Sequence, residues 1–150
     1  MRILGIDPAL TKSGWAVIER VGNTNKYIAS GIIKTDSKTP LPERLKVIYK
    51  AVANVISEYN PDSASIEETF VNKNPATSLK LGCARGAIMT CLAMHDLQVS
   101  EFTAKYIKKS LTGSGAADKN QMLKMITLLM PKAQVKYDDE ADAIAIALAA

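Results

Sequence analysis

The sequence predicts an α/β protein with a five-stranded mixed sheet flanked by helices. Its first 35 residues contain three segments of strand character, and residues 22–25 form a short hairpin connection between two of them. From residue 40 onward the apolar residues follow helical spacing, and helices alternate with two short apolar strands. Hairpins pair strands antiparallel, whereas helical crossovers pair them parallel, so the sheet should contain both kinds of pairing.

The first strand has the clearest signal. It is apolar at Ile3, Leu4 and Ile6 and is interrupted by Pro8. The fourth strand is short and ends at the acidic pair Glu67-Glu68. In chain order, the predicted strands are Arg2–Asp7, Gly14–Val21, Lys26–Thr35, Ser63–Ile66 and Leu97–Phe102.

The first helix is amphipathic and extends from Pro40 to Tyr59, where Asn60-Pro61-Asp62 ends it. We find no internal repeat, low-complexity stretch or linker, so residues 1–150 should form a single domain. The later helices are expected at Thr77–His95, Ala104–Leu111, Asp118–Met130 and Glu140–Ala149.

Composition excludes several classes of protein. The chain has 150 residues, 47% of them hydrophobic, and no apolar run approaches the roughly 20 residues of a membrane span. Gly5 and Asp7 interrupt the region where a secretory signal would be apolar, so a cytoplasmic location is expected. Two cysteines, Cys83 and Cys91, and the single histidine, His95, cannot build a disulfide framework or a zinc site. Any divalent metal must therefore be bound by oxygen.

The net charge of +4 is unevenly distributed. Residues 70–137 contain ten basic and three acidic residues, whereas residues 138–142 contain four acidic ones and no basic residue. A basic surface beside a tight acidic cluster predicts that a polyanion is held against a metal site.

Four carboxylates are the candidates for that site. Asp7 and Glu67 lie at the carboxyl ends of strands that the right-handed crossover rule favours as parallel neighbours. Asp139 and Asp142 are three residues apart at the start of the last helix and share one face. Such a cluster requires protonation or a divalent cation, and oxygen ligands favour Mg²⁺ or Mn²⁺, with room for two ions.

Each acid also has an ordinary structural interpretation, which for Glu67 is that of an exposed surface acid. Asp7 precedes Pro8 and could simply form a turn at the strand end. Asp139 and Asp142 could complement the dipole of the last helix. The four acids together, rather than any one of them, favour a catalytic site.

Taken together, these motifs resemble one family. The opening LGIDP and SGWAV segments are similar to those of the RuvC-type Holliday-junction resolvases, and further matching segments follow in the family's order over essentially the whole chain. The further matches are Ile66-Glu67, Phe70, Lys73-Asn74, the run from Leu79 to Gly86 and the run from Asp139 to Ala147.

The resemblance implies a ribonuclease-H-like fold and a homodimer that resolves four-way DNA junctions by paired symmetric nicks, leaving 5′-phosphate and 3′-hydroxyl ends. It also makes a branch-migration motor a candidate partner. Asp7, Glu67, Asp139 and Asp142 match the family's metal-binding acids, with Mg²⁺ as cofactor and Mn²⁺ as substitute. Phe70 matches an aromatic residue that stacks on DNA bases. Lys108, as a catalytic residue, and Lys119 match lysines near the cleaved phosphate; the other expected DNA contacts are Lys73, Lys80, Arg85 and Lys109.

Several alternatives remain open from the sequence. A ribonuclease-H-like enzyme that trims RNA, a fragment of an actin-like or sugar-kinase ATPase, and a junction-binding protein without activity each share part of the pattern. Gly82 and Gly86, spaced i,i+4, permit close approach of another helix, either within the chain or across a dimer seam.

Overall fold

The computed structural model describes residues 1–69 and 73–150, so the predicted DNA contact Phe70 lies outside the described residues. Five strands form one sheet in the order β3-β2-β1-β4-β5. β1 pairs antiparallel with β2 and parallel with β4, so the predicted mixed sheet is confirmed. The strands are β1 Arg2–Asp7, β2 Lys12–Val21, β3 Thr24–Lys34, β4 Ser63–Glu67 and β5 Gln98–Phe102.

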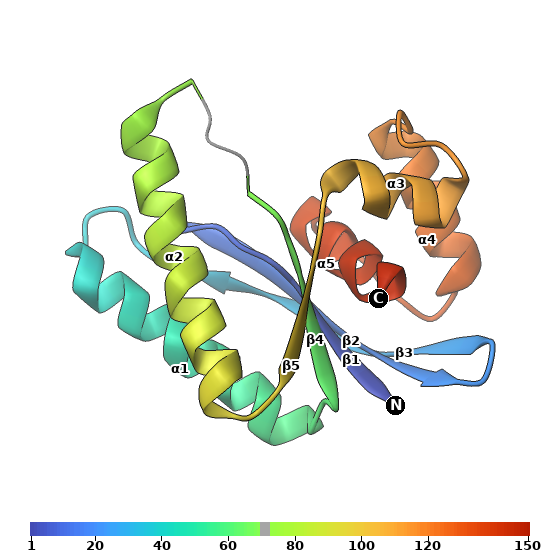
Figure 1. Ribbon diagram of the computed structural model, residues 1–150, viewed down its shortest axis with the longest axis horizontal. Coiled ribbons are helices and arrows are strands. Elements are labelled where there is room, and N and C mark those ends of the chain that lie inside the picture. The colour runs from blue at the N-terminus through green and yellow to red at the C-terminus, as the bar shows by residue number, and fades with distance from the viewer. Residues whose placement is uncertain (70–72) are drawn as a thin grey trace.

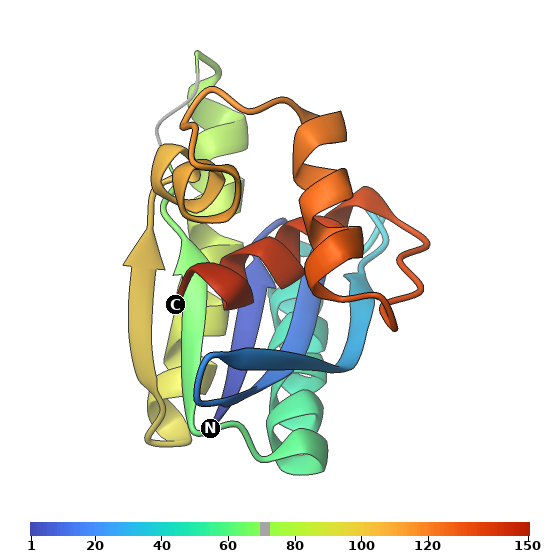
Figure 2. The ribbon, with the colours of Figure 1, turned by 90° about the vertical axis from the view of Figure 1, so that its right-hand side faces the viewer.

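Five helices in the described residues cover the two faces of this sheet (Figure 1). α1 and α2 lie on one face, while α3, α4 and α5 lie on the other. Figure 2 shows α5 running across the strands. The helices are α1 Leu41–Tyr59, α2 Pro75–Met94, α3 Ala104–Thr112, α4 Lys119–Leu129 and α5 Asp138–Ala149.

The start of α2 differs from the expected Thr77. Asn74 is the N-cap, and its side-chain oxygen accepts hydrogen bonds from the backbone N–H groups of Ala76 and Thr77. Pro75 occupies the first helical position, where its missing N–H costs nothing. The Asn-Pro pair therefore begins the helix two residues earlier than its apolar pattern indicates.

The alternation of side chains along β1 separates two hydrophobic cores. Leu4 and Ile6 belong to the core beneath α1 and α2, whereas Ile3 belongs to the core beneath α3, α4 and α5. Successive side chains of a strand point to opposite faces, so Asp7 shares the α5 face with Ile3. In β4, Ser65 faces α5, and by the same alternation Glu67 does too. The sheet thus directs both carboxylates to the face that carries α5.

Close backbone contact holds α5 against β1 and β2. A Cβ atom added to Gly5 would lie 2.3 Å from the carbonyl oxygen of Ala143, and one added to Gly14 would lie 1.9 Å from that of Asp139. The buried Ser65 hydroxyl donates a hydrogen bond of 3.0 Å to the carbonyl oxygen of Ile146. The absence of side chains at two glycines therefore sets how closely α5, and the acids at its start, approach the sheet.

In the part of the chain that the structure describes, every helix is either too short or too polar to cross a lipid bilayer.

Candidate active site

The first two acids of the predicted site lie side by side at one edge of the sheet. Ile6 of β1 pairs with Ile66 of β4 in a parallel register, so the next residues, Asp7 and Glu67, follow adjacent strand positions. The parallel pairing expected from the crossover rule is therefore present. Burial, and to a lesser degree the charge of Asp142, raise the pKa of Glu67, while Lys108 opposes the rise.

The other two acids come from the first turn of α5, which begins at Asp138. Burial and, in decreasing order, the charges of Asp142, Glu67 and Asp139 together raise the pKa of Asp7 to about 7, while the charge of Lys119 opposes the rise. Burial also raises the pKa of Asp142, with Asp139 contributing in the same direction. Asp7, Glu67 and Asp142, which are far apart in sequence, thus lie in one environment that opposes their full ionisation, and the charge of Asp139 acts on two of them.

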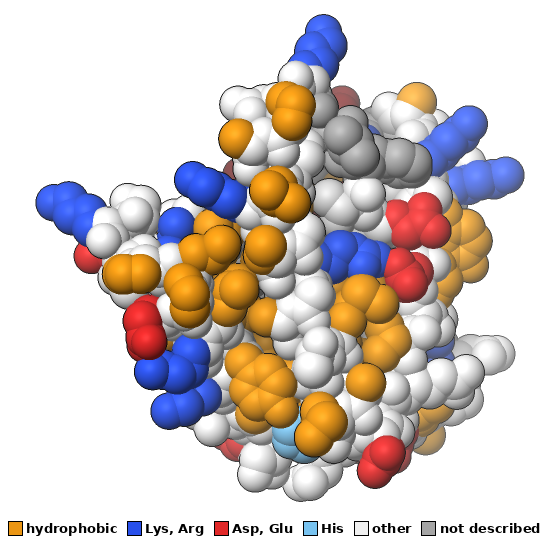
Figure 3. Space-filling view, turned by 60° about the vertical axis from the view of Figure 1, so that its left-hand side comes forward, with side chains coloured by type: hydrophobic (Ala, Val, Ile, Leu, Met, Phe, Trp, Pro, Cys, Tyr) orange, Lys and Arg blue, Asp and Glu red, His pale blue; other side chains and the backbone are white. Residues whose placement is uncertain are grey.

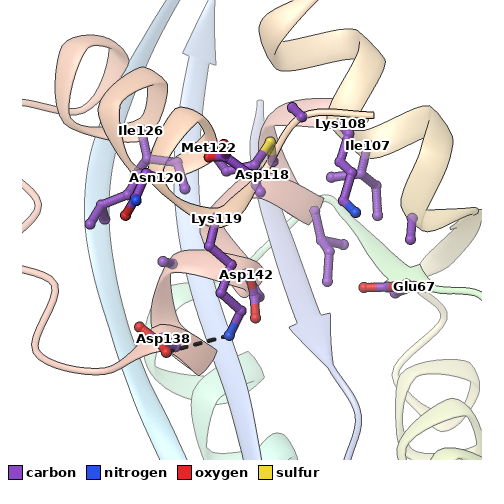
Figure 4. A pocket seen from close by; sticks show the side chains of 16 residues that line it. Glu67, Ile107, Lys108, Asp118, Lys119, Asn120, Met122, Ile126, Asp138 and Asp142 are labelled. Carbon is purple, nitrogen blue, oxygen red and sulfur yellow. Dashed lines mark hydrogen bonds and ion pairs between the residues drawn. The ribbon is translucent and has the colours of Figure 1, made fainter. Parts of the chain in front are cut away.

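A cavity of about 460 Å³ opens beside these acids, between α3, α4 and α5 (Figure 4). Glu67 and Asp142 line its acidic part, and Lys108 and Lys119 also lie on its wall. The remaining wall is largely apolar, with Ile107, Met122, Leu123, Ile126 and Ile146 among its residues. The cavity offers space for part of a ligand next to the carboxylates.

The donor chemistry of the four acids fits a hard divalent cation, because carboxylate oxygens are the ligands that Mg²⁺ and Mn²⁺ prefer. The part of the rise in the pKa of Asp7 that comes from Asp142, Glu67 and Asp139 fits it too, since a cation would relieve this repulsion. Within residues 1–69 and 73–150, however, no three acidic, histidine or cysteine side chains are grouped closely enough to hold one ion. One of the four carboxylates is held by a lysine: Lys12 Nζ lies 3.2 Å from Asp139 Oδ2.

Two of the predicted lysines lie close to the acids. Lys108 lowers the pKa of Glu67, and both Lys108 and Lys119 lower that of Asp142. Lys119 Nζ also lies 3.4 Å from Asp138 Oδ2, but both side chains are more than 80% exposed, so this ion pair contributes little stability. Figure 4 shows Lys119 pointing toward Asp138 at the edge of the cavity.

The remaining basic candidates lie elsewhere. Lys73 immediately precedes α2 and Lys80 lies on it, on the opposite side of the sheet from α5, and both side chains are exposed. Lys109 is exposed on α3. Arg85 of α2 forms an ion pair with Glu101 of β5, and its side chain is only 15% exposed. Its guanidinium group is therefore already occupied by a partner in the same chain.

Two contributors were not identified from the sequence. The sequence indicates no role for Lys12, because the proximity of Lys12 to Asp139 depends on the packing of α5 on β2. In the sequence Glu140 is one member of an acidic run, but in the structure it is buried, and its carboxylate accepts hydrogen bonds from the backbone N–H groups of Lys136 and Tyr137. A glutamate three residues into a helix is a sequence signal for this capping arrangement.

We expect Glu140→Ala to lower the free energy of unfolding by about 1–3 kcal/mol, because two backbone donors at the start of α5 lose their acceptor. Urea unfolding monitored by circular dichroism measures this change. Glu43→Ala is the matched control: Glu43 forms an exposed ion pair with Lys46, and its loss should change stability by less than about 0.5 kcal/mol. Equal losses in the two variants would contradict a capping role for Glu140.

Comparison with solved structures identifies the fold. The Thermus thermophilus RuvC structure in complex with a Holliday junction substrate matches 99% of this chain and 92% of its own, with a TM-score of 0.93 and 28% identity. The yeast mitochondrial Holliday junction resolvase is similar in fold, with a TM-score of 0.72 and 13% identity, over 98% of this chain and 76% of its own. The expected ribonuclease-H-like fold is thereby confirmed, and fold and site together define a class of nucleic-acid-cleaving enzymes.

Sequence comparison narrows this class to one family. The family model for "Crossover junction endodeoxyribonuclease RuvC" matches residues 3–150. A relative with the same description in Rickettsia bellii is 53% identical over 98% of this chain and 94% of its own length. Another in Beijerinckia indica is 45% identical over 99% of this chain and 85% of its own length. The chain belongs to the RuvC family, as its motifs predicted, and the kinase-fragment alternative is set aside.

Proposed function

We propose that this protein is a structure-selective endodeoxyribonuclease that resolves four-way DNA junctions by paired symmetric nicks. The observation that carries the proposal is the environment of Asp7, where burial and the charges of Asp142, Glu67 and Asp139 together raise its pKa to about 7. A site that concentrates negative charge in this way suits cations that in turn bind a phosphodiester. Membership of the RuvC family supports DNA junctions as the substrate.

In this proposal Asp7, Glu67, Asp139 and Asp142 would hold Mg²⁺, with Mn²⁺ as a substitute and two ions per site. Bound divalent ions supply an activated water and stabilise the leaving oxygen of a phosphodiester. Hydrolysis would leave 5′-phosphate and 3′-hydroxyl ends. The residues 1–150 would act as one nuclease domain.

The lysines around the acids would bind and orient the DNA. Lys108 lies on the cavity wall close enough to Glu67 to influence its pKa, so its ammonium group can offset negative charge that develops on the phosphate. Lys119 is more than 80% exposed, lowers the pKa of Asp142 and would contact a backbone phosphate. Lys73, Lys80 and Lys109 are exposed and remain candidate DNA contacts, as does Phe70; Arg85 would first have to leave Glu101.

We propose that two copies of the chain form the active enzyme, since a junction with two-fold symmetry matches a symmetric dimer with two sites. Hydrophobic side chains gather on the face formed by α1 and α2 (Figure 3), where Val47, Leu79 and Met94 are between 44% and 71% exposed. Added Cβ atoms at Gly82 and Gly86 would meet nothing within 4 Å, so these glycines do not serve packing among the described residues. This face is our candidate dimer seam.

The decisive experiment is incubation of the protein with a labelled mobile four-way junction, with and without Mg²⁺. We expect symmetric nicks only with the metal, and no comparable cleavage of a linear duplex or an RNA–DNA hybrid. Preferred cleavage of the hybrid would favour the RNA-trimming alternative. Binding of the junction without cleavage in either Mg²⁺ or Mn²⁺ would favour the non-catalytic one. Adding a branch-migration motor to the same reaction tests the predicted partner.

The predicted location of the protein remains the cytoplasm.

Replacement of Lys119 by alanine should weaken junction binding and flatten its salt dependence. Each lost phosphate contact lowers the slope of log affinity against log salt by about 0.9 on duplex DNA. Binding titrations at several salt concentrations in Ca²⁺ measure the slope. Lys26→Ala, at the opposite end of the sheet, is the matched control and should leave the slope unchanged. An unchanged slope for Lys119→Ala would remove this lysine from the DNA interface.

A further inference from the structure

We propose that Lys12 is an internal counter-ion of Asp139, which must release this carboxylate before Asp139 can bind a metal ion. Lys12 would then set the Mg²⁺ affinity of the site without touching the metal. The inference rests on the proposed function, because it takes Asp139 as a metal ligand. It makes Lys12 a positioning residue of the nuclease.

The first observation is the ion pair itself. Lys12 Nζ lies 3.2 Å from Asp139 Oδ2, with side chains 37% and 29% exposed, so the pair is only partly solvated. Asp139 reaches Lys12 because the start of α5 rests on Gly14, two residues further along β2. The same packing that brings Asp139 to the site therefore also brings it within reach of Lys12.

The second observation is that the four acids interact electrostatically but are not grouped closely enough to bind an ion. The charge of Asp139 raises the pKa of Asp7, so the two carboxylates interact electrostatically. Yet no group of three acids in the described part of the chain is arranged to hold an ion, and Asp139 points one of its oxygens at Lys12. A cation entering the site must compete with the lysine for this carboxylate.

The third observation is a second partner for the lysine. Lys12 Nζ lies 4.5 Å from the centre of the Tyr137 ring, close enough for a cation–π contact. When Asp139 turns toward a metal ion, the ammonium group keeps this contact. Release of the carboxylate therefore leaves the lysine partnered, which lowers the cost of breaking the ion pair.

The test compares the melting temperature of the full chain and of Lys12→Met, each in EDTA and in saturating Mg²⁺ without DNA. In EDTA the variant should melt about 1–3 °C lower, because it lacks the ion pair. In saturating Mg²⁺ the two should melt together, because Asp139 has left Lys12 in both. The Mg²⁺ affinity of the variant, from the dependence of melting temperature on Mg²⁺, should be about two- to fivefold tighter.

Lys34→Met is the matched control. Lys34 Nζ lies 5.3 Å from the same tyrosine ring but, among the described residues, is not in an ion pair with Asp139, so its replacement should leave Mg²⁺ affinity unchanged. Lys12→Arg, which keeps the positive charge, should restore the behaviour of the unmodified chain. In an Asp139→Asn background, Lys12→Met should no longer alter Mg²⁺ affinity, which separates a direct pair from a general effect of charge.

The possible failures can be told apart. If Lys12→Met melts lower by the same amount with and without Mg²⁺, or tightens Mg²⁺ binding equally in the Asp139→Asn background, Lys12 is a structural or long-range charge and the inference is wrong. If Mg²⁺ does not stabilise the unmodified chain at all, the metal site itself is wrong, and the inference is overturned together with the proposed function.

Discussion

Asp7→Asn is expected to reduce junction cleavage about a thousandfold or more while leaving junction binding intact. A bound cation contributes several kcal/mol to stabilising the charge of the transition state, and each 1.36 kcal/mol is a factor of ten in rate. The lysines around the site are unchanged, so affinity for the junction should persist. Single-turnover cleavage in Mg²⁺, with binding measured in parallel in Ca²⁺, gives both quantities.

The same substitution should stabilise the metal-free protein, which makes it a test of the site's electrostatics as well as of its chemistry. The pKa of Asp7 is about 7 in the folded chain and 3.8 in its ordinary state, a difference that corresponds to about 4 kcal/mol at most. Because the folded pKa is raised, the cost of ionising Asp7 is present at pH 8 and is relieved as the pH falls through 7. The gain in stability should therefore be largest at pH 8 and vanish near pH 4.

Urea unfolding in EDTA at pH 8, 6 and 4 measures this gain. Asp36→Asn is a suitable control, because Asp36 is an exposed acid in the loop after β3. Full cleavage by Asp7→Asn would end the nuclease proposal. If Asp7→Asn loses cleavage as expected but is not more stable at pH 8, the crowding of negative charge around Asp7 is contradicted.

Gly14→Ala is expected to give the largest loss of stability, about 3 kcal/mol or more, together with a large loss of cleavage. The added Cβ would lie 1.9 Å from the carbonyl oxygen and 2.5 Å from the carbonyl carbon of Asp139, and both atoms belong to the backbone. They can give way only if the start of α5 moves off β2, since overpacking against fixed atoms is relieved by backbone shifts. Such a shift displaces Asp139 from the site.

Gly22→Ala separates the loss of a glycine from the clash. Gly22 has φ +57° in the turn between β2 and β3, and an added Cβ there meets nothing within 4 Å. The free energy of unfolding of this variant should fall by about 1–2 kcal/mol through backbone strain, and its cleavage rate should be unchanged. Denaturant unfolding and single-turnover cleavage are measured on both variants. Wild-type cleavage by Gly14→Ala would show that the seat of α5 on β2 does not position the acids.

The sequence alone is sufficient to place Asp7 and Glu67 together. Both residues end a strand, and the strong right-handed preference of parallel crossovers makes the two strands neighbours. It also placed Asp139 and Asp142 on one face of the last helix. Its limits appear where position depends on packing between distant segments. The ion pair of Lys12 with Asp139 needs the contact of α5 on Gly14, and the inward turn of Glu140 needs the path of residues 136–137. Neither follows from local periodicity.

The separation of the four acids among β1, β4 and α5 has a consequence for the biosynthesis of the enzyme. A nascent chain that has emerged only as far as β4 carries Asp7 and Glu67 but lacks the helix that completes their set. Under the proposed function, such a fragment cannot nick chromosomes, however well its sheet has formed. Unwanted cleavage of the genome is thus restricted to chains that have been fully synthesised and have folded.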